Sequence, residues 1–257
     1  MTKVFLSAGH GGNDPGAVGN GLKEKDINLI IMLSCSEYLN KHGVSTIVSR
    51  TKDENDPVTD EVREANASGA KVAVSFHTNA GGGDGSESLY HSYSKEGKKL
   101  AELCEKHVKA IGQNSRGIKE RDGLWFLRGT NMTSVLCECG FIDNKKDKEI
   151  IDTKDEQKAF GIAYAKAILD YLGIDYKETP ITSKTIYKVQ VGAYKSKSNA
   201  YKMLDKVKKA SFSDAVITAS NGIYHVQIGA YKSKKNAKSM LEKVKNAGFK
   251  DAIIKNA

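Results

Sequence analysis

The last third of the chain is an internal repeat, which narrows the possible folds of that region more than any other feature. The first copy, residues 186–217, reads IYKVQVGAYKSKSNAYKMLDKVKKASFSDAVI, and the second, residues 223–254, reads IYHVQIGAYKSKKNAKSMLEKVKNAGFKDAII. Each copy predicts a strand with alternating apolar residues, a turn, a helix with one apolar face and a second strand. One copy cannot bury both apolar faces. We therefore expect the two copies to fold together as a four-stranded sheet covered on one side by two helices.

The distribution of charge also divides the chain in two. Residues 181–257 contain sixteen lysines, no arginine and four acidic residues, a net charge of +12, whereas residues 1–180 carry −3. Such a difference suggests two units with different roles. A helical pattern over residues 155–172 stops at Gly173, and a short segment with Pro180 follows. We predict a first domain over residues 1–175, a linker over 176–184 and a second domain over 185–257, built from repeats 185–219 and 222–256.

The first domain alternates apolar runs of strand length with amphipathic stretches of helix length. This alternation predicts an α/β sandwich with a mostly parallel sheet, whereas the repeat predicts a small α+β unit with an RNP-like outline. The expected segments, in chain order, are 4–7, 27–41, 45–49, 58–67, 72–76, 86–93, 98–110, 134–139 and 155–172.

A glycine-rich loop follows the first strand, in LSAGHGGNDPGAVGNGLKEKDINL, residues 6–29. Glycine costs backbone entropy and gives no side chain to bury, so a loop this rich in glycine usually forms a tight turn or binds a phosphate or a metal ion. A phosphate is disfavoured, because the loop matches neither GxGxxG entering a helix nor GxxxxGKS/T. The loop also has His10 and Asp14 where a phosphate loop needs bare backbone or lysine.

Four residues that can bind a metal are expected at one edge of the sheet. In open α/β sheets, ligands bind beyond the carboxyl ends of the strands. Three expected strands end at His10, His77 and Glu138, and Glu24 lies just before the first helix. Two histidines and two glutamates suit a metal site with a spare carboxylate. Three protein ligands with an open fourth position are typical of catalytic zinc.

Other residues of the same types have simpler interpretations. Asp14 and Asp26 are the main alternatives to Glu24 as a ligand, but we expect Asp14 to shape the loop and Asp26 to cap the helix that starts at Ile27. The histidines expected at the surface or at the ends of elements are His42, His91 and His107. Arg121 and Arg128 are candidates to contact carboxylates of a substrate, but we expect them to lie in a solvated loop.

Three blocks of the first domain, in this order, resemble the zinc-dependent N-acetylmuramoyl-L-alanine amidases, which cut bacterial peptidoglycan. The blocks are SAGHGGNDPGAVGNGLKE, VSFHTN and LCECGFIDN, and the resemblance covers residues 1–172. Matched motif by motif, it implies that His10, Glu24 and His77 bind Zn²⁺ and that Glu138 is the catalytic carboxylate.

The resemblance also implies the reaction, which is hydrolysis of the amide bond between the lactyl group of N-acetylmuramic acid and L-alanine of the stem peptide. Zinc lowers the pKa of a bound water molecule to roughly 7 and polarises the carbonyl. Glu138 can accept a proton from that water and pass it to the departing amine. Strand alternation agrees, because it places Cys137 and Cys139 on the face opposite Glu138, where we expect both thiols to be buried.

The repeat resembles the SPOR domain, through the matching halves YKVQVGAY and YHVQIGAY. The resemblance implies binding of bacterial peptidoglycan, with a preference for glycan strands stripped of stem peptides, and Gln190 and Gln227 match the motif glutamine. If Tyr187, Val189 and Val191 face the helices, both glutamines face outward from the open side of the sheet. We expect most of the lysines to be a solvated surface.

The same features predict where the protein acts. No stretch approaches the roughly 20 apolar residues of a membrane-spanning helix, and no signal peptide precedes the first strand, so we expect no membrane insertion. Four cysteines fit a reducing compartment. We predict synthesis in the cytoplasm and action on the cell wall after the membrane is permeabilised. A phage or prophage endolysin is the main interpretation, and a mother-cell lysin of a spore former is the alternative.

Two further alternatives belong to other classes of protein. One is a wall-binding protein that has lost its activity, which the intact set of four site residues disfavours. The other is an RNA-binding protein, suggested by the charge and the RNP-like outline of the repeat. We expect no nucleic-acid partner, because the repeat has no arginine and lacks the aromatic RNP1 pattern.

Overall fold

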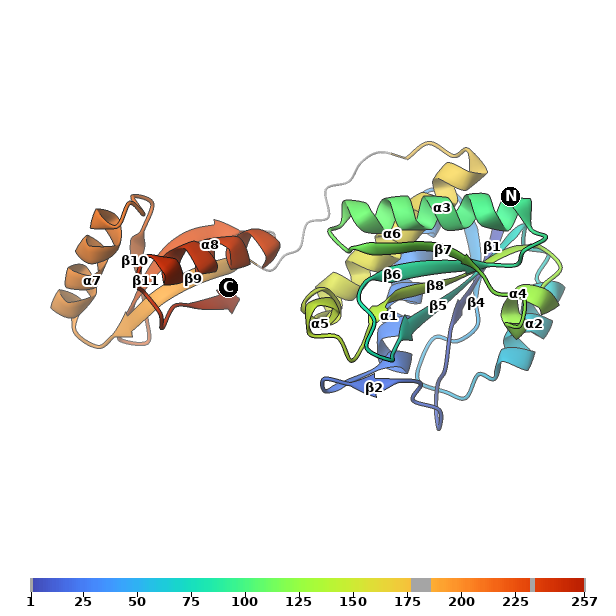
Figure 1. Cartoon of the computed structure of the whole chain (residues 1–257), viewed down its shortest axis with the longest axis horizontal. Coiled ribbons are helices and arrows are strands. Elements are labelled where there is room, and N and C mark those ends of the chain that lie inside the picture. Colours follow the sequence, from blue (N-terminus) through green and yellow to red (C-terminus); the bar gives the residue numbers. More distant parts are fainter. Residues whose placement is uncertain (1, 177–185, 232–233, 257) are drawn as a thin grey trace. The chain divides into compact units, whose positions relative to one another are not determined.

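The computed structural model describes residues 2–176, 186–231 and 234–256. Contacts divide the chain into two compact units, Met1–Glu178 and Thr179–Ala257 (Figure 1). The predicted linker, residues 176–184, lies outside the described residues except for Tyr176. Each unit is therefore described by itself.

A six-stranded sheet forms the centre of the first unit, in the order β4-β1-β5-β8-β6-β7. β4, β1, β5 and β8 run parallel, whereas β6 runs antiparallel to β8 and parallel to β7. The predicted mostly parallel α/β sheet is confirmed. The strands are β1 (Lys3–Ala8), β4 (Ser45–Val48), β5 (Val72–Asn79), β6 (Ser86–Tyr90), β7 (Ser115–Glu120) and β8 (Thr133–Phe141).

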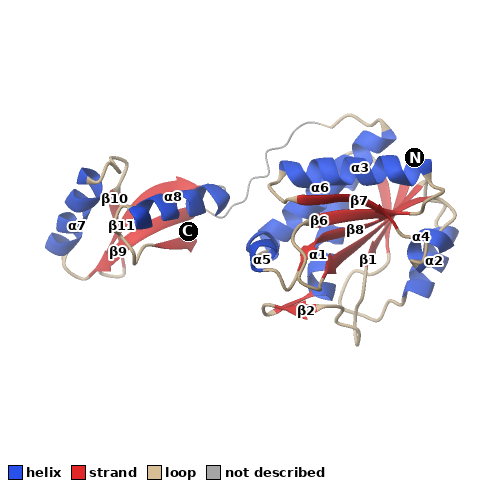
Figure 2. Cartoon of the chain, viewed as in Figure 1, coloured by secondary structure: helices blue, strands red, loops and turns tan. Residues whose placement is uncertain are grey.

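Helices cover both faces of this sheet (Figure 2). α1, α3 and α6 share one apolar core with the strands, and α2 and α4 share the core on the opposite face. The remaining elements are the short α5 and a two-stranded hairpin, β2 with β3. Their bounds are α1 (Glu24–Lys41), α2 (Val58–Ala67), α3 (Lys95–Ala110), α4 (Trp125–Gly129), α5 (Lys145–Ile151), α6 (Lys154–Leu172), β2 (Val18–Gly19) and β3 (Leu22–Lys23).

Alternation along β5 decides which side chains face which helices. Val74 and Phe76 belong to the core under α1, α3 and α6, whereas Ala73 belongs to the core under α2 and α4. Since successive residues of a strand point to opposite faces, Ser75 and His77 point to the α2/α4 side. His77 therefore lies at the carboxyl end of a central strand, on the less covered face.

The predicted end of the long helix is confirmed by its geometry. α6 begins with a capping box between Thr153 and Glu156, and it ends at Gly173 with φ = 66°. That left-handed conformation favours glycine because it carries no β-carbon. The hairpin, β7, α4 and α5 were not predicted, since these pieces are short and lack a clear apolar period.

The described residues of the second unit form four strands and two helices in the order that the repeat predicts. Its antiparallel sheet has the order β10-β11-β9-β12. The core combines residues of both copies, including Val189 and Val207 from the first and Val226 and Val244 from the second. The elements are β9 (Tyr187–Tyr194), α7 (Lys197–Lys209), β10 (Val216–Ser220), β11 (Ile223–Tyr231), α8 (Lys234–Asn246) and β12 (Ile253–Asn256).

Among the described residues, no helix combines the length and the apolar character that crossing a bilayer requires.

Candidate metal centre and active site

Three of the predicted site residues meet at the carboxyl edge of the central strands. His10 follows β1, Glu24 begins α1 and His77 lies on β5. One ligand atom from each residue lies within 4.8 Å of the other two. Oε1 of Glu24 lies 3.3 Å from Nε2 of His10 and 3.0 Å from Nδ1 of His77. Residues far apart in the sequence thus present two imidazoles and one carboxylate to a common point.

Two glycines explain why the loop before α1 is rich in that residue. A β-carbon on Gly9 would lie 2.2 Å from the His77 ring. A β-carbon on Gly16 would lie 2.6 Å from Oε2 of Glu24 and 2.7 Å from the His10 ring, and Gly16 also has φ = 63°. The backbone passes so close to the three side chains that only glycine fits.

Glu24 is held in place by the backbone around it. It is only 5 % exposed, and its Oε2 accepts a hydrogen bond from the Ala17 backbone at 2.8 Å. Its Oε1 accepts one from the Thr78 backbone at 3.0 Å and one from the Asn28 amide at 3.3 Å. Burial favours the neutral acid, but hydrogen bonds from both histidines outweigh it and hold the pKa of Glu24 well below its usual range. The carboxylate is therefore ionised and fixed in orientation.

Asp14 orients the imidazole of His10. Its Oδ2 lies 2.8 Å from Nδ1 of His10, and its Oδ1 accepts a hydrogen bond from the Gly16 backbone at 3.0 Å. The hydrogen bonds that His10 makes with Glu24 and with Asp14 raise its pKa to about 9. Burial acts in the opposite direction but is outweighed. A carboxylate on the far nitrogen of a histidine is the usual partner of a metal ligand. The sequence predicted that Asp14 shapes the loop, but not that it orients His10.

The prediction that Asp26 caps the first helix is wrong. α1 begins at Glu24, its N-cap residue is Lys23 and no side chain caps it. The backbone amides of Glu24 and Lys25 instead donate to the carbonyls of Ala17 and Pro15. Carbonyl groups of the loop thus accept the hydrogen bonds of the first helical amides. Asp26 lies in the first turn and does not cap the helix.

Glu138 lies beside His77 on the neighbouring strand. The two residues are partners in the parallel register of β5 and β8, so their side chains leave the same face of the sheet. Burial, reinforced by the charges of Glu24 and Glu87, raises the pKa of Glu138 to about 7. Its Oε2 is buried and has no hydrogen-bond partner among the described residues. Glu138 is thus a carboxyl group able to take up and release a proton near neutral pH.

Cys137 and Cys139 point away from the site, as predicted. Both are fully buried in the core under α1, α3 and α6. Thr78 contacts the Cys139 sulfur at 3.3 Å. Neither thiol faces Glu138, so the C-x-C pair is part of the core and not of the metal cluster.

Two cations lie on the far side of Glu138 from His77. Glu87 is the register partner of Glu138 on β6, and it binds Nε of Arg116 at 2.7 Å and Nζ of Lys119 at 2.5 Å. Arg116 and Lys119 did not stand out in the sequence, because their strand β7 was not predicted.

The three other histidines and the two arginines considered in the sequence analysis lie outside the cluster. His42 ends α1 and stacks on Tyr38, and His107 pairs with Asp170 at 2.7 Å. His91 lies 3.6 Å from Asp122. Arg121 is exposed, and Arg128 lies over the Trp125 ring.

Gln190 and Gln227 lie side by side in the sheet of the second unit. They are register partners, flanked by Ile253 on β12 and Val216 on β10. Their strand neighbours Val189 and Val226 enter the core, so the glutamines lie on the other face. Each is only 9 % exposed, however, and His225 Nδ1 lies 3.0 Å from Oε1 of Gln190. The glutamines thus face the side of the sheet away from the core, as expected, but the central strands and a neighbouring imidazole cover most of their surface.

The first unit therefore has the fold and the donor set of a metal-dependent hydrolase. Two histidines and one carboxylate converge at the end of parallel strands, a second carboxylate orients one histidine, and a buried glutamate with a raised pKa lies next to them.

Comparison with known proteins assigns this unit to a family. Residues 4–170 match the family model described as N-acetylmuramoyl-L-alanine amidase, and the chain belongs to that family. Residues 183–256 match the SPOR domain.

Relatives of this chain include cellular and viral proteins. The sporulation-specific N-acetylmuramoyl-L-alanine amidase of Bacillus subtilis is 36% identical over 223 residues, which cover 84% of this chain and 85% of that protein. The endolysin of Bacillus phage SPP1 is 36% identical over 183 residues, which cover 68% of this chain and 67% of that protein. Among solved structures, the catalytic domain of CwlV, an amidase of Bacillus (Paenibacillus) polymyxa, aligns with a TM-score of 0.64 and 30% identity. It covers 68% of this chain and 100% of that chain. Amide hydrolysis in peptidoglycan is thus the activity of this chain.

Proposed function

We propose that His10, Glu24 and His77 hold Zn²⁺ and that Glu138 moves the proton in hydrolysis of the amide bond between N-acetylmuramic acid and L-alanine. The position of Glu138 carries this proposal. It is a buried carboxyl group with a pKa near 7, one strand away from His77 and free of hydrogen bonds at Oε2 within the described residues.

The residues present fit zinc. Their donor atoms are two imidazole nitrogens and one carboxylate oxygen, a ligand set used by catalytic zinc sites with an open position. The Asp14 carboxylate, hydrogen-bonded to Nδ1 of His10, supplies the outer partner that such sites use to orient a histidine.

In the reaction, one water is added across the amide. When held by His10, Glu24 and His77, zinc would supply a Lewis acid and a water molecule of lowered pKa. Glu138 accepts a proton from the water as the C–O bond forms, and donates it to the nitrogen as the C–N bond breaks. The products are the lactyl carboxylate on the sugar and a free amino group on L-alanine.

Analysis of the new ends in digested peptidoglycan tests this reaction. Wild-type protein should release new amino groups on L-alanine without new reducing sugars. A chelator should stop the release, and added zinc should restore it. New reducing ends, or full activity in protein verified to be metal-free, would refute the proposal.

We propose further that residues 1–175 form the amidase domain and that residues 185–257, an RNP-like α+β unit made from two repeats, bind glycan. The match to the SPOR domain supports the second assignment. Gln190 and Gln227 contribute hydrogen bonds through the part of each amide that remains accessible, between Val216 and Ile253.

Binding to insoluble peptidoglycan tests the glutamines. Full-length Glu138→Gln protein avoids digestion during the experiment, and Gln190→Ala with Gln227→Ala in that background should release it from walls at moderate salt. The lysine surface alone would instead be screened by salt within about 8 Å. Normal retention of the folded double variant would rule out the glutamines. Loss of all retention in moderate salt with the glutamines intact would favour a nonspecific basic surface.

For the biological setting, we propose an endolysin made in the cytoplasm that reaches the wall after the membrane is permeabilised, as the name of the phage relative suggests. A mother-cell lysin is the second candidate, because the sporulation-specific relative matches 84% of the chain. Cells that express the protein should lyse only after permeabilisation. Lysis without it would contradict both.

A further inference from the structure

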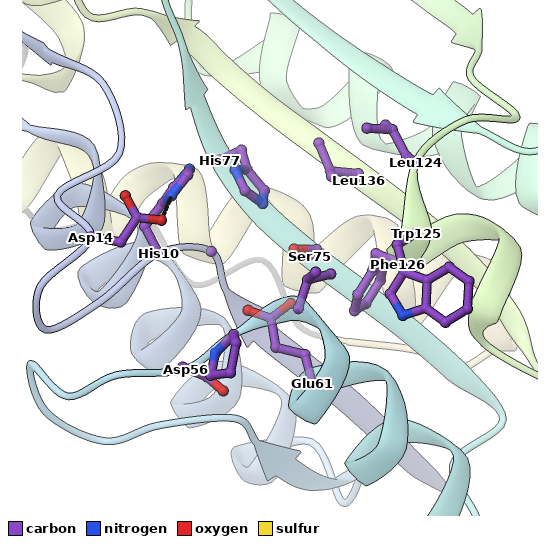
Figure 3. Close-up of a pocket in the computed structure, with 13 residues that line it drawn as sticks. His10, Asp14, Asp56, Glu61, Ser75, His77, Leu124, Trp125, Phe126 and Leu136 are labelled. Atoms are coloured by element: carbon purple, nitrogen blue, oxygen red, sulfur yellow. Dashed lines mark hydrogen bonds and ion pairs between the residues drawn. The ribbon is translucent and has the colours of Figure 1, made fainter.

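A pocket of about 300 Å³ extends from the candidate metal centre along the α2/α4 side of the sheet. His10 and His77 line one end and Trp125 lines the other, with Ser75, Asp56 and Glu61 between them (Figure 3). This volume lies at the small end of ligand pockets in proteins, so the space beside the metal centre suits one compact group of the substrate.

Trp125 is an exposed aromatic residue at the end of this pocket. Its side chain begins the short helix α4 and remains 43 % exposed, whereas Phe126 next to it is buried. The guanidinium of Arg128 lies 4.8 Å from the centre of the indole ring. A large ring held in place at the mouth of a pocket, and not used by the core, offers a flat apolar surface to a ligand.

The floor of the pocket is acidic. Glu61 is 2 % exposed, and Oδ2 of Asp56 is buried without a hydrogen-bond partner among the described residues. Carboxyl oxygens accept hydrogen bonds whether or not the group carries a proton. The pocket therefore favours a group that brings O–H or N–H donors.

The sugar and the peptide on either side of the scissile amide differ in their hydrogen-bond donors and in their charge. A pyranose ring has a face of C–H groups, and N-acetylmuramic acid adds hydroxyl and acetamido N–H donors. Stem peptides carry free carboxylates, which Arg116 and Lys119, beyond Glu138, attract. The sugar fits the pocket, and the peptide fits the opposite side.

Building on the amide hydrolysis proposed above, we infer that this pocket binds the muramyl sugar next to the scissile bond. The Trp125 ring lies against one face of the sugar, and Asp56 and Glu61 accept hydrogen bonds from its polar groups. The stem peptide then leaves past Glu138 toward Arg116 and Lys119. Trp125 is a specificity-determining residue, because it distinguishes a muramyl amide from the same amide without sugar.

The sequence offers a direct probe, since Trp125 is the single tryptophan of the chain. In zinc-loaded Glu138→Gln protein, N-acetylmuramoyl-L-alanyl peptide should shift the tryptophan emission to shorter wavelength and saturate. The matching lactoyl-L-alanyl peptide, which lacks the sugar, should leave the emission unchanged. An equal shift with both ligands would place the peptide arm on Trp125, and no shift with either would remove Trp125 from the site. Both results overturn the inference.

Kinetics on peptidoglycan gives a second test. Trp125→Ala should raise KM about 10-fold, as is typical for loss of an aromatic anchor, and should change kcat less. Tyr93→Ala is the matched control, because Tyr93 is 90 % exposed in the same unit and does not line the pocket. Unchanged KM in Trp125→Ala would contradict the inference. Release of L-alanine amino groups by wild-type protein is measured separately, so a failure of the reaction itself is recognised independently.

Discussion

The backbone of Gly9 touches the imidazole of His77, so that a β-carbon on Gly9 would lie 2.2 Å from Cε1 and Nε2 of that ring. We predict that Gly9→Ala displaces His77 and weakens zinc binding at least 10-fold, with a parallel loss of activity. Zinc affinity measured by competition with a chelating dye checks this. Gly123→Ala is the control, because a β-carbon there meets no atom within 4 Å. Equal zinc affinity in Gly9→Ala and wild type would mean that the close contact between Gly9 and His77 does not determine zinc binding.

Asp14 should tune zinc affinity without being a ligand. Asp14→Asn keeps an oxygen for the Gly16 amide but removes the charge beside Nδ1 of His10. Loss of such outer partners costs about 10–100-fold in metal affinity or activity. We expect a loss at the low end of that range, in the same dye competition, while Asp205→Asn in the second unit should have no effect. A complete loss of zinc would indicate that Asp14 binds the metal directly.

Binding zinc and using it should be separable. Glu138→Gln leaves His10, Glu24 and His77 in place, so we expect normal zinc content. We also expect activity to fall by about 10²–10⁴-fold because the proton carrier is gone. His77→Ala should lose both. Zinc content by atomic absorption and release of L-alanine amino groups give the two measurements. If Glu138→Gln loses zinc, then Glu138 is a ligand.

Glu61 should make stability depend on pH. Burial raises its pKa from 4.5 to about 7, so the folded chain binds this proton more tightly than the unfolded chain. Stability then falls as pH rises from about 4.5 through about 7. Each pKa unit corresponds to about 1.4 kcal/mol, so the effect on the free energy of unfolding reaches a few kcal/mol.

Glu61→Gln should remove this dependence. Urea unfolding of chelator-treated protein at several pH values between 5 and 8 should show a flatter curve for Glu61→Gln than for wild type, with the greatest gain above pH 7. Glu102→Gln, on the exposed surface of α3, should follow the wild-type curve. Parallel curves for Glu61→Gln and wild type would show that Glu61 has an ordinary pKa.

The two repeats of the tail should fold only together. Their core combines residues of both copies, and the rings of Phe212 and Phe249 lie 6.5 Å apart. A fragment over residues 179–257 should therefore show a cooperative thermal transition by circular dichroism. Fragments over 179–221 and 222–257 should show none. A cooperative transition in either half would contradict the shared core.

Much of the site could be predicted because its residues lie next to strong local signals. His10 and Glu24 bracket a loop whose glycines have no role in a core, and His77 and Glu138 end apolar runs. The family resemblance then supplied the role of each residue. Strand alternation was sufficient to separate Glu138 from Cys137 and Cys139.

The rest of the site depends on contacts that no local pattern contains. Asp14 becomes a partner of His10 only because the loop folds back. Trp125 and Arg116 belong to α4 and β7, which are short or weakly patterned, and their positions follow from neighbours distant in sequence. The burial of Gln190 and Gln227 likewise reflects the order of the strands, which places both at the centre of the sheet.

All four cysteines lie in the core of the first unit, and none is bonded to another. Burial raises the pKa of Cys35, Cys137 and Cys139, which keeps these thiols protonated. Thiolates, not thiols, react with oxidants and with disulfides. The amidase unit consequently gains nothing from a reducing environment and offers oxidising surroundings no accessible thiol to attack. Moving the folded amidase unit from reducing to oxidising surroundings therefore leaves these thiols unchanged.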